Sequence, residues 1–235
     1  MDTPYIMMLI VTLLAIIGSS FLPKSSTFTI RIGAACWILL STYFVIEWIV
    51  LRASTAFYSV LRQPMSDLGV TACGTDTYVL ASYEICSPYH LWMNWTFTLT
   101  GLAIAVGAVC LHSCWPQLKQ TKIATGLLIV LGVSYSLSGI FPANVNFDLH
   151  TWPALLGMLV QIPALILIAR SIRPSMPKLA VWTWCCTVLT SAAFLLICLQ
   201  PMVPSLPGGL LQRIFYGAVF LWMVVTGVVL WRNKD

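Results

Sequence analysis

Seven long runs of apolar residues follow one another along this chain, and they are continuous rather than alternating with polar residues. Each run reaches the roughly 20 residues that a helix needs to cross a hydrocarbon layer about 30 Å thick. A transmembrane barrel would instead show strands of about ten residues with alternating polarity. We therefore predict seven membrane-spanning helices over residues 4–22, 32–51, 91–111, 123–141, 152–169, 179–199 and 210–231.

The composition excludes an ordinary soluble domain. Apolar residues make up 59% of the chain, charged residues only 8%, and the mean hydropathy is +0.91, whereas a soluble surface needs far more charge. The connections between most runs are too short to hold a separate core. We predict an all-α fold, in which residues 1–235 form one polytopic membrane helical bundle, an integral multi-pass protein.

Lys and Arg are distributed unevenly between the two sides of this predicted bundle. Positive residues in short flanking loops resist translocation, so the side that holds most of them is cytoplasmic. With the N-terminus outside and the C-terminus cytoplasmic, only Arg52, Arg62 and Arg213 fall outside. Nine of the 12 Lys and Arg residues then fall inside: Lys24, Arg31, Lys119, Lys122, Arg170, Arg173, Lys178, Arg232 and Lys234.

A cleaved signal peptide is the alternative for the first run. Gly18, Ser19 and Ser20 resemble the small residues of a cleavage site. However, no Lys or Arg precedes the run, and cleavage would leave Lys24 and Arg31 outside. The charge pattern therefore favours a retained first helix.

The pI near 8.8 raises the question of an anionic partner. The excess positive charge is spread over three loops and a tail, and no basic cluster, stacking motif or Gly-rich phosphate loop is present. This spread is typical of membrane topology and of contact with anionic lipid head groups. We expect membrane lipids as partners and no nucleic acid, while the pattern leaves the oligomeric state open.

The longest segment outside the membrane, residues 52–90, is predicted to be extracytoplasmic. Residues 53–63 mix apolar and polar side chains, which suits a short amphipathic helix along the interface. Cys73 and Cys86 follow in a compartment that permits oxidation. A disulfide between them would close a ring near 14 residues and contribute about 3 kcal/mol.

Ionisable side chains at membrane depth are costly, so each one indicates a functional site until a partner explains it. Glu47 and Arg213 are predicted at matching depths, about one turn from the outer ends of their helices. Two interpretations stay open for them. They form an ion pair, or they handle a substrate or protons.

Other polar residues gather on the same outer side and could share one pocket. We predict catalytic roles, as acid, base or ligand, for Asp67, Asp148 and His150, because carboxylates and imidazoles support such chemistry. Their spacing matches no zinc motif, so we assign no cofactor and no metal ligands, and a bound metal ion is kept as the minor alternative. The predicted substrate-binding residues are Glu47, Ser66, His90, Asn94 and Arg213.

Short motifs along the chain resemble the family of multi-pass membrane proteins known as domain of unknown function 998. They run from about residue 32 to the C-terminus and keep the family's order. The motifs are Phe57-Tyr58-Ser59, Pro64-Met65-Ser66-Asp67-Leu68-Gly69, Met93-Asn94 with Gly101, Ser138-Gly139-Ile140-Phe141-Pro142, Asp148-Leu149-His150 and Gly209-Leu210-Leu211-Gln212-Arg213.

This resemblance implies a helical membrane bundle with its polar signature at one face, and it brings no established activity. It marks Ser66, Asp67, Asn94, His150 and Arg213 as signature positions. The run over residues 4–22 looks like an addition to a six-helix core.

Three functions remain open at this point. The first is a protein that binds, and in one version modifies, a lipid or other amphiphilic small molecule at its extracytoplasmic end. The second is a small proton-coupled transporter that uses Glu47 and Asp67 as protonatable sites. The third is a non-catalytic assembly or accessory protein. The sequence leaves open whether the protein is an enzyme.

Overall fold

The computed structural model describes residues 2–23 and 25–232, so Lys24, Lys234 and Asp235 lie outside the described residues. Within that part the chain is helical, with seven helices long and apolar enough to cross a membrane. The elements in chain order are α1 (Thr3–Ser20), α2 (Thr27–Leu39), α3 (Thr42–Ala53), η1 (Met65–Gly69), α4 (His90–Leu111), η2 (His112–Cys114), α5 (Lys119–Ile140), α6 (Phe147–Ile172), α7 (Pro177–Leu199) and α8 (Gly208–Arg232).

The second membrane span consists of two helices rather than the one predicted over residues 32–51. α2 and α3 together cover Thr27–Ala53, with a break near Leu40 and Ser41. The hydroxyls of Ser41 and Thr42 donate to the carbonyls of Ile38 and Leu39. Such local bonds compete with the regular helical pattern, which accounts for the break.

Two of the helices that begin before their predicted boundaries, α2 and α6, are each capped by a polar residue. α6 begins at Phe147, five residues before the predicted start at residue 152. The side chain of Asn146 accepts a hydrogen bond from the backbone N–H of Leu149 and so caps the helix. The polar first turn of α6 thus belongs to the helix rather than to a loop.

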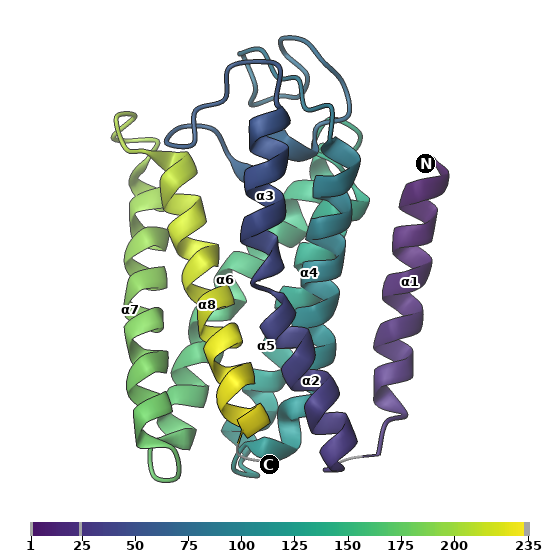
Figure 1. The fold of residues 1–235 in the computed structure, drawn as a ribbon. Helices are drawn as coiled ribbons and strands as arrows, with labels where there is room; N and C mark the ends of the chain where they lie inside the picture. The colour runs from purple at the N-terminus through teal and green to yellow at the C-terminus, as the bar shows by residue number, and fades with distance from the viewer. Residues whose placement is uncertain (1, 24, 233–235) are drawn as a thin grey trace.

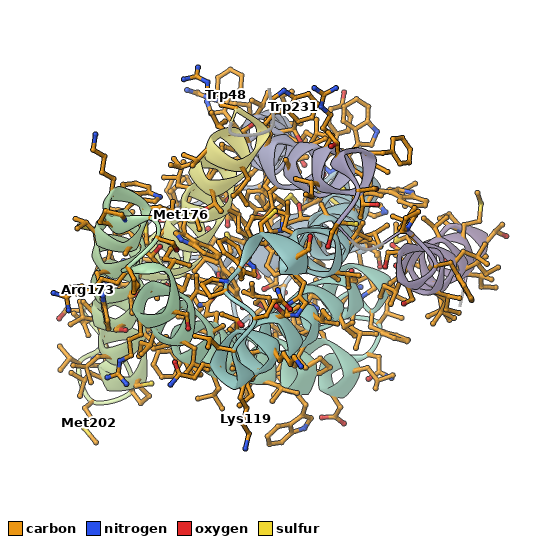
Figure 2. All side chains as sticks on the ribbon, turned by 90° about the horizontal axis from the view of Figure 1, so that it is seen from below. Trp48, Lys119, Arg173, Met176, Met202 and Trp231 are labelled. Carbon is orange, nitrogen blue, oxygen red and sulfur yellow. A yellow bond between two sulfur atoms is a disulfide. The ribbon has the colours of Figure 1, made fainter. Side chains whose placement is uncertain are left out.

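The long connection between α3 and α4 lies at one end of the bundle (Figure 1), and the two ends differ in charge. We call the end that carries residues 54–89 the loop end, and the opposite end the basic end. The six described carboxylates lie at the loop end or one turn from it: Asp2, Glu47, Asp67, Asp76, Glu84 and Asp148. The described basic residues at the other end are Arg31, Lys119, Lys122, Arg170, Arg173, Lys178 and Arg232. Figure 2 views the bundle from this basic end and shows Lys119 and Arg173 extending away from the helices.

α4 is the central helix of the bundle, and it packs against α1, α2, α3 and α5. A Cβ atom at Gly101 would come within 2.5 Å of Gly132 and Ser136 on α5. Only a glycine therefore allows α4 and α5 to approach this closely. The small side chain at this position is thus one reason why α4 can lie at the centre of the bundle.

α1 stands at the edge of the bundle, next to α4 (Figure 1). Tyr5 and Met8 pack against Ile140 of α5, whereas Leu13, Leu14 and other apolar residues of α1 are exposed. α1 therefore contacts the rest of the bundle along one narrow strip of its surface.

The segment after α3 is not the amphipathic helix that residues 53–63 suggested. It is an irregular chain with one turn before η1. Its backbone groups bind elsewhere: the N–H of Thr55 donates to Cys86, and the carbonyls of Val60 and Gln63 accept from Arg213. Tertiary hydrogen bonds thus replace the helical ones. Further on, the sulfur atoms of Cys73 and Cys86 lie at disulfide distance.

Candidate functional site

A cavity of about 440 Å³ lies at the loop end. Its walls come from the segment around η1, from residues 78–83, and from α6, α7 and α8. We call it the loop-end cavity. Polar and apolar residues both line it, and the lining residues deepest along α6 and α7 are apolar. The polar lining residues used below are Arg62, Ser66, Tyr78, Tyr83, His150 and Gln212, and the apolar ones are Leu155, Met158 and Ile197.

His150 presents one ring nitrogen to the cavity. It lies in the first turns of α6, and its Nδ1 is 3.1 Å from the carbonyl oxygen of Ser138 and 2.9 Å from that of Phe141. Both partners are acceptors, so Nδ1 carries the proton and donates. The neutral ring then has an unprotonated Nε2, which can accept a hydrogen bond or a proton, or bind a metal.

Asp67 is buried behind the wall of the cavity. Tyr78 donates to its Oδ1 at 2.6 Å and Tyr83 donates to its Oδ2 at 2.8 Å, while Gln63 is 3.5 Å from Oδ2. Burial raises the pKa of the Asp67 carboxyl above its usual range, and the bonds from the two tyrosines oppose that rise. The same carboxylate, together with burial, raises the pKa of both tyrosine hydroxyls.

Tyr78 and Tyr83 line the loop-end cavity, and the sequence reasoning missed both. They belong to the segment between Cys73 and Cys86, so the cysteine pair holds them in place. Tyr78 also stacks on Phe147 of α6, with ring centroids 6.0 Å apart. Two tyrosines between a pair of extracytoplasmic cysteines, close in sequence to a buried aspartate, are the signal that could have found them.

Ser66 lies in η1 and lines the cavity, and its hydroxyl has no hydrogen-bond partner among the described residues. η1 is fixed at its start by α8, because the side chain of Gln212 accepts a hydrogen bond from the N–H of Met65 at 2.9 Å. The carbonyl of Gln212 is thereby occupied, while its amide nitrogen faces the cavity side. Ser66 and His150, predicted to share a pocket, do share this one.

Arg213 and Glu47 form the ion pair that was one of the two open interpretations. Nε of Arg213 lies 2.9 Å from Oε1 of Glu47. The two terminal nitrogens bind the Tyr58 hydroxyl at 2.7 Å and the carbonyls of Val60, Gln63 and Gly209 at 3.0 to 3.1 Å. The guanidinium thus joins α3, the irregular segment and α8. We call Glu47, Tyr58 and Arg213 the clamp.

The shared pocket proposed for all the polar residues is corrected here, because the clamp does not line the loop-end cavity. All three guanidinium nitrogens of Arg213 are already bound by protein atoms, so little remains to hold a ligand.

Asn94 also lies outside the loop-end cavity. It is 0% exposed, and its amide donates to the Gly69 carbonyl at 2.8 Å and to the Tyr5 hydroxyl at 3.3 Å. It fastens η1 and α1 to α4.

His90 and Asp148 also lie outside the cavity. His90 is in the first turn of α4, where its Nδ1 is 3.0 Å from the carbonyl of Ser87. Asp148 is exposed in the first turn of α6, a position where a carboxylate interacts favourably with the helix dipole. Among the described residues, no three His, Cys, Asp or Glu side chains gather as a metal ion requires.

The chain matches the family model described as protein of unknown function, DUF998, over residues 35–229. It belongs to the DUF998 family. No curated protein and no solved structure matches the chain. The matched range begins inside α2, so α1 lies outside the part that the DUF998 model covers.

The five signature positions of this DUF998 protein all lie at the loop end, but they divide between two environments. Ser66 and His150 line the cavity, and Asp67 supports its tyrosine wall. Asn94 and Arg213 join elements of the fold. These five residues of the chain therefore combine a cavity wall with the contacts that hold that wall in place.

Proposed function

We propose that this DUF998 protein binds an amphiphilic small molecule in the loop-end cavity. The observation that carries the proposal is the change of polarity along that cavity. Ser66 and the free Nε2 of His150 mark its polar part. Leu155 and Met158, one to two turns further along α6, mark its apolar part together with Ile197 of α7. A molecule with one polar and one hydrocarbon end suits this arrangement.

The polar part offers specific chemistry to such a ligand. Nε2 of His150 accepts a hydrogen bond or a proton from a hydroxyl or amine group, and the Ser66 hydroxyl can donate or accept. Arg62 at the rim supplies a positive charge for an anionic substituent. We assign acid–base capacity to His150 and a supporting role to Asp67, which orients Tyr78 and Tyr83.

We further propose that the loop end is extracytoplasmic, with the N-terminus outside and the C-terminus cytoplasmic. The opposite end carries most of the positive charge, as cytoplasmic flanks do. The cysteine pair at the loop end also suits an oxidising compartment. A ligand would then enter from the outer leaflet or from the water above it.

The ion-paired state of Glu47 and the aromatic core favour binding over proton-coupled transport. Transport needs polar groups at several depths. Below the clamp, the rings of Tyr43, Phe97, Tyr135 and Phe220 pack against one another with centroids 5.1 to 6.3 Å apart. This cluster fills the centre of the bundle with aromatic carbon.

Binding is tested by filling the cavity. The variant Ala154→Phe places a ring inside it, and Ala192→Phe, at an exposed position on α7, is the matched control. We expect native mass spectrometry of the purified protein to show a retained amphiphile in the wild type and the control, and at least a tenfold lower occupancy in Ala154→Phe. Equal occupancy in both variants would remove this cavity as the binding site. Retention of one constant protein partner without any ligand would favour the accessory role.

Topology is tested with two serines in short exposed connections. Ser205 lies in the α7–α8 connection at the loop end, and Ser175 in the α6–α7 connection at the basic end. In intact cells, a membrane-impermeant maleimide should label Ser205→Cys and leave Ser175→Cys unlabelled, with the wild-type chain giving the background. The reverse pattern would invert the proposed topology.

A further inference from the structure

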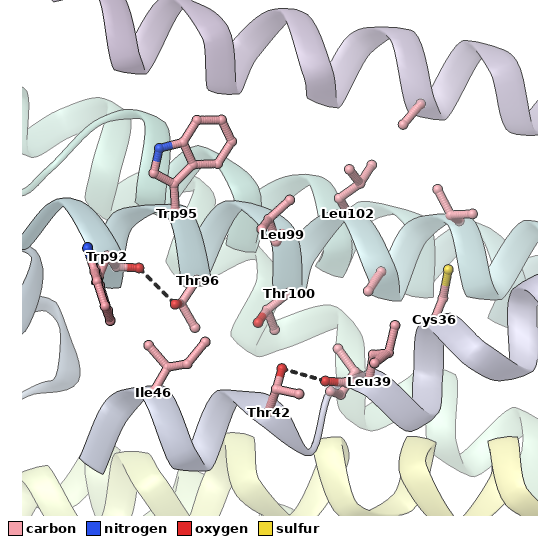
Figure 3. Close-up of a pocket in the computed structure, with 14 residues that line it drawn as sticks. Cys36, Leu39, Thr42, Ile46, Trp92, Trp95, Thr96, Leu99, Thr100 and Leu102 are labelled. Carbon is pink, nitrogen blue, oxygen red and sulfur yellow. Dashed lines mark hydrogen bonds between the residues drawn. The ribbon is translucent and has the colours of Figure 1, made fainter. Parts of the chain in front are cut away.

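Two more cavities lie between α1 and the rest of the bundle, away from the proposed site. The larger has a volume of about 630 Å³ and is bordered by α1, by α2 and α3, and by α4. Along α4 it extends from Trp92 to Val106, about 21 Å at 1.5 Å per residue. Figure 3 shows Trp95, Leu99 and Leu102 of α4 on the side of α1, and Ile46 and Thr42 on the opposite side. We call this the apolar α1 cavity.

Two of the three threonine hydroxyls that line this cavity are bonded to the backbone. The hydroxyl of Thr96 donates to the carbonyl of Trp92, and that of Thr42 donates to the carbonyl of Leu39 (Figure 3). These two hydroxyl protons are therefore bound to backbone oxygens, and the rest of the lining is hydrocarbon and indole apart from the Thr100 hydroxyl and the Cys36 thiol. Such a lining suits a hydrocarbon chain and offers little to a polar solute.

The second cavity, of about 580 Å³, follows toward the basic end. Val106 lines the first cavity and Cys110, one turn later on α4, lines the second. Here a larger part of the lining is polar than in the apolar α1 cavity. It includes Ser19 and Ser20 of α1, Thr29 of α2, His112, Ser113 and Thr125. We call this the polar α1 cavity.

Hydrogen bonds and charge in the polar α1 cavity favour an anionic group. The Ser113 hydroxyl is buried without a hydrogen-bond partner, so a donor is available. Lys122 on α5 lies one turn before Thr125, which lines the cavity. The six described carboxylates lie at or near the other end of the bundle. The hydroxyls of Ser19, Ser20 and Thr29 donate to backbone carbonyls. An anion here therefore meets the Ser113 hydroxyl and the positive charge of Lys122, and no described carboxylate lies at this end of the bundle.

We infer that these two cavities form one lipid site, separate from the loop-end cavity. Its occupant is an anionic, phosphate-bearing lipid of the leaflet at the basic end. The phosphate lies beside Ser113 in the polar α1 cavity, and one hydrocarbon chain runs along α4 through the apolar α1 cavity toward Trp92. α1 forms the outer wall of both parts, which gives a role to the helix that the family match leaves out.

The test uses the full chain, purified in detergent, and three single-chain lipids. Native mass spectrometry measures occupancy by lysophosphatidylglycerol, zwitterionic lysophosphatidylcholine and uncharged monoacylglycerol. We expect lysophosphatidylglycerol to bind at least tenfold more tightly than monoacylglycerol. We also expect Ala103→Phe, which fills the apolar α1 cavity, to lower its occupancy at least tenfold, and Ser113→Ala to lower it about threefold.

The variant Ala154→Phe separates this site from the proposed function, because it fills only the loop-end cavity. It should leave lysophosphatidylglycerol occupancy unchanged, and Ala103→Phe should leave the loop-end ligand in place. Thermal melting of each variant checks that it is folded. Equal binding of all three lipids, or wild-type occupancy in Ala103→Phe, would overturn the inference. A loss of lysophosphatidylglycerol in Ala154→Phe would assign that lipid to the loop-end cavity instead.

Discussion

The clamp and the loop-end cavity are neighbours at one end of the bundle, yet they use their polar groups in opposite ways. In the clamp, Arg213 binds Glu47, Tyr58 and three backbone carbonyls, so protein atoms occupy every nitrogen of its side chain. In the cavity, Ser66 has an unbound hydroxyl, and His150 has one nitrogen bound and one free. The candidate site is therefore distinguished by polar groups that still have a free hydrogen-bonding atom. Charged groups at membrane depth do not distinguish it, because those of the clamp are all paired.

The largest expected effect is the loss of the clamp. Arg213→Met leaves Glu47 buried without its partner, which should cost about 3–5 kcal/mol of stability. The double variant Glu47→Met with Arg213→Met should be less destabilised, because no charge is orphaned. Arg52→Met is the control, since exposed Arg52 only lies over the ring of Trp48. Thermal melting in detergent measures all three, and an Arg213→Met protein as stable as the control would show that the clamp is dispensable.

The next effect concerns the cysteine pair above the cavity. Replacing Cys73 and Cys86 by Ser should lower the free energy of unfolding by about 3 kcal/mol. It should also make residues 73–86 accessible to protease, because Tyr78 and Tyr83 then lose the ring that positions them. Cys185→Ser, at an exposed free cysteine, is the control. Protease resistance of that segment equal to the wild type would contradict the role of this pair.

Removing the free nitrogen of His150 should affect the ligand rather than the fold. In His150→Asn, the amide N–H can still donate to the carbonyls of Ser138 and Phe141, while Nε2 is lost. We expect at least a tenfold weaker retention of the ligand, which corresponds to about 1.4 kcal/mol. His90→Asn is the matched control, because His90 also bonds a carbonyl and lies outside the cavity. Equal losses in both variants would argue against a specific role for Nε2.

A smaller effect is expected from the titration of Asp67. Burial raises the pKa of this carboxyl in the folded protein above that in the unfolded chain. The folded state then binds the proton more tightly, so stability rises as the pH falls through the raised pKa and levels off below the ordinary carboxyl pKa. Asp67→Asn should remove this part of the pH dependence. Melting curves of both proteins across the acidic range give the difference, and identical pH profiles would contradict it.

Asp148→Asn should have the smallest effect. The exposed carboxylate lies at the start of α6 and outside the cavity, so the change should stay within about 0.5 kcal/mol and leave ligand retention unchanged. A loss of retention as large as that in His150→Asn would return Asp148 to the site.

The sequence predicted the helices well and the site only in part, for a physical reason. A membrane-spanning helix can be predicted from its own stretch of sequence. Lipid offers no hydrogen bonds, so the backbone groups must bond within the helix. His150 and Ser66 were found because polar residues at one membrane face are few. Tyr78 and Tyr83 were missed, since tyrosine is also common at membrane interfaces and only the fold brings these two to Asp67.

The sequence by itself determined an all-helical membrane protein with its carboxylates near one end and most of its basic residues at the other. The tertiary structure decided which polar groups have partners. Hydropathy and charge are sums over neighbouring residues, and they can be counted along the chain. Whether a guanidinium is enclosed by carbonyls or an imidazole nitrogen faces a cavity depends on residues up to about 150 positions apart, such as Arg213 and Gln63. The distances in space between such residues are fixed only when the helices pack.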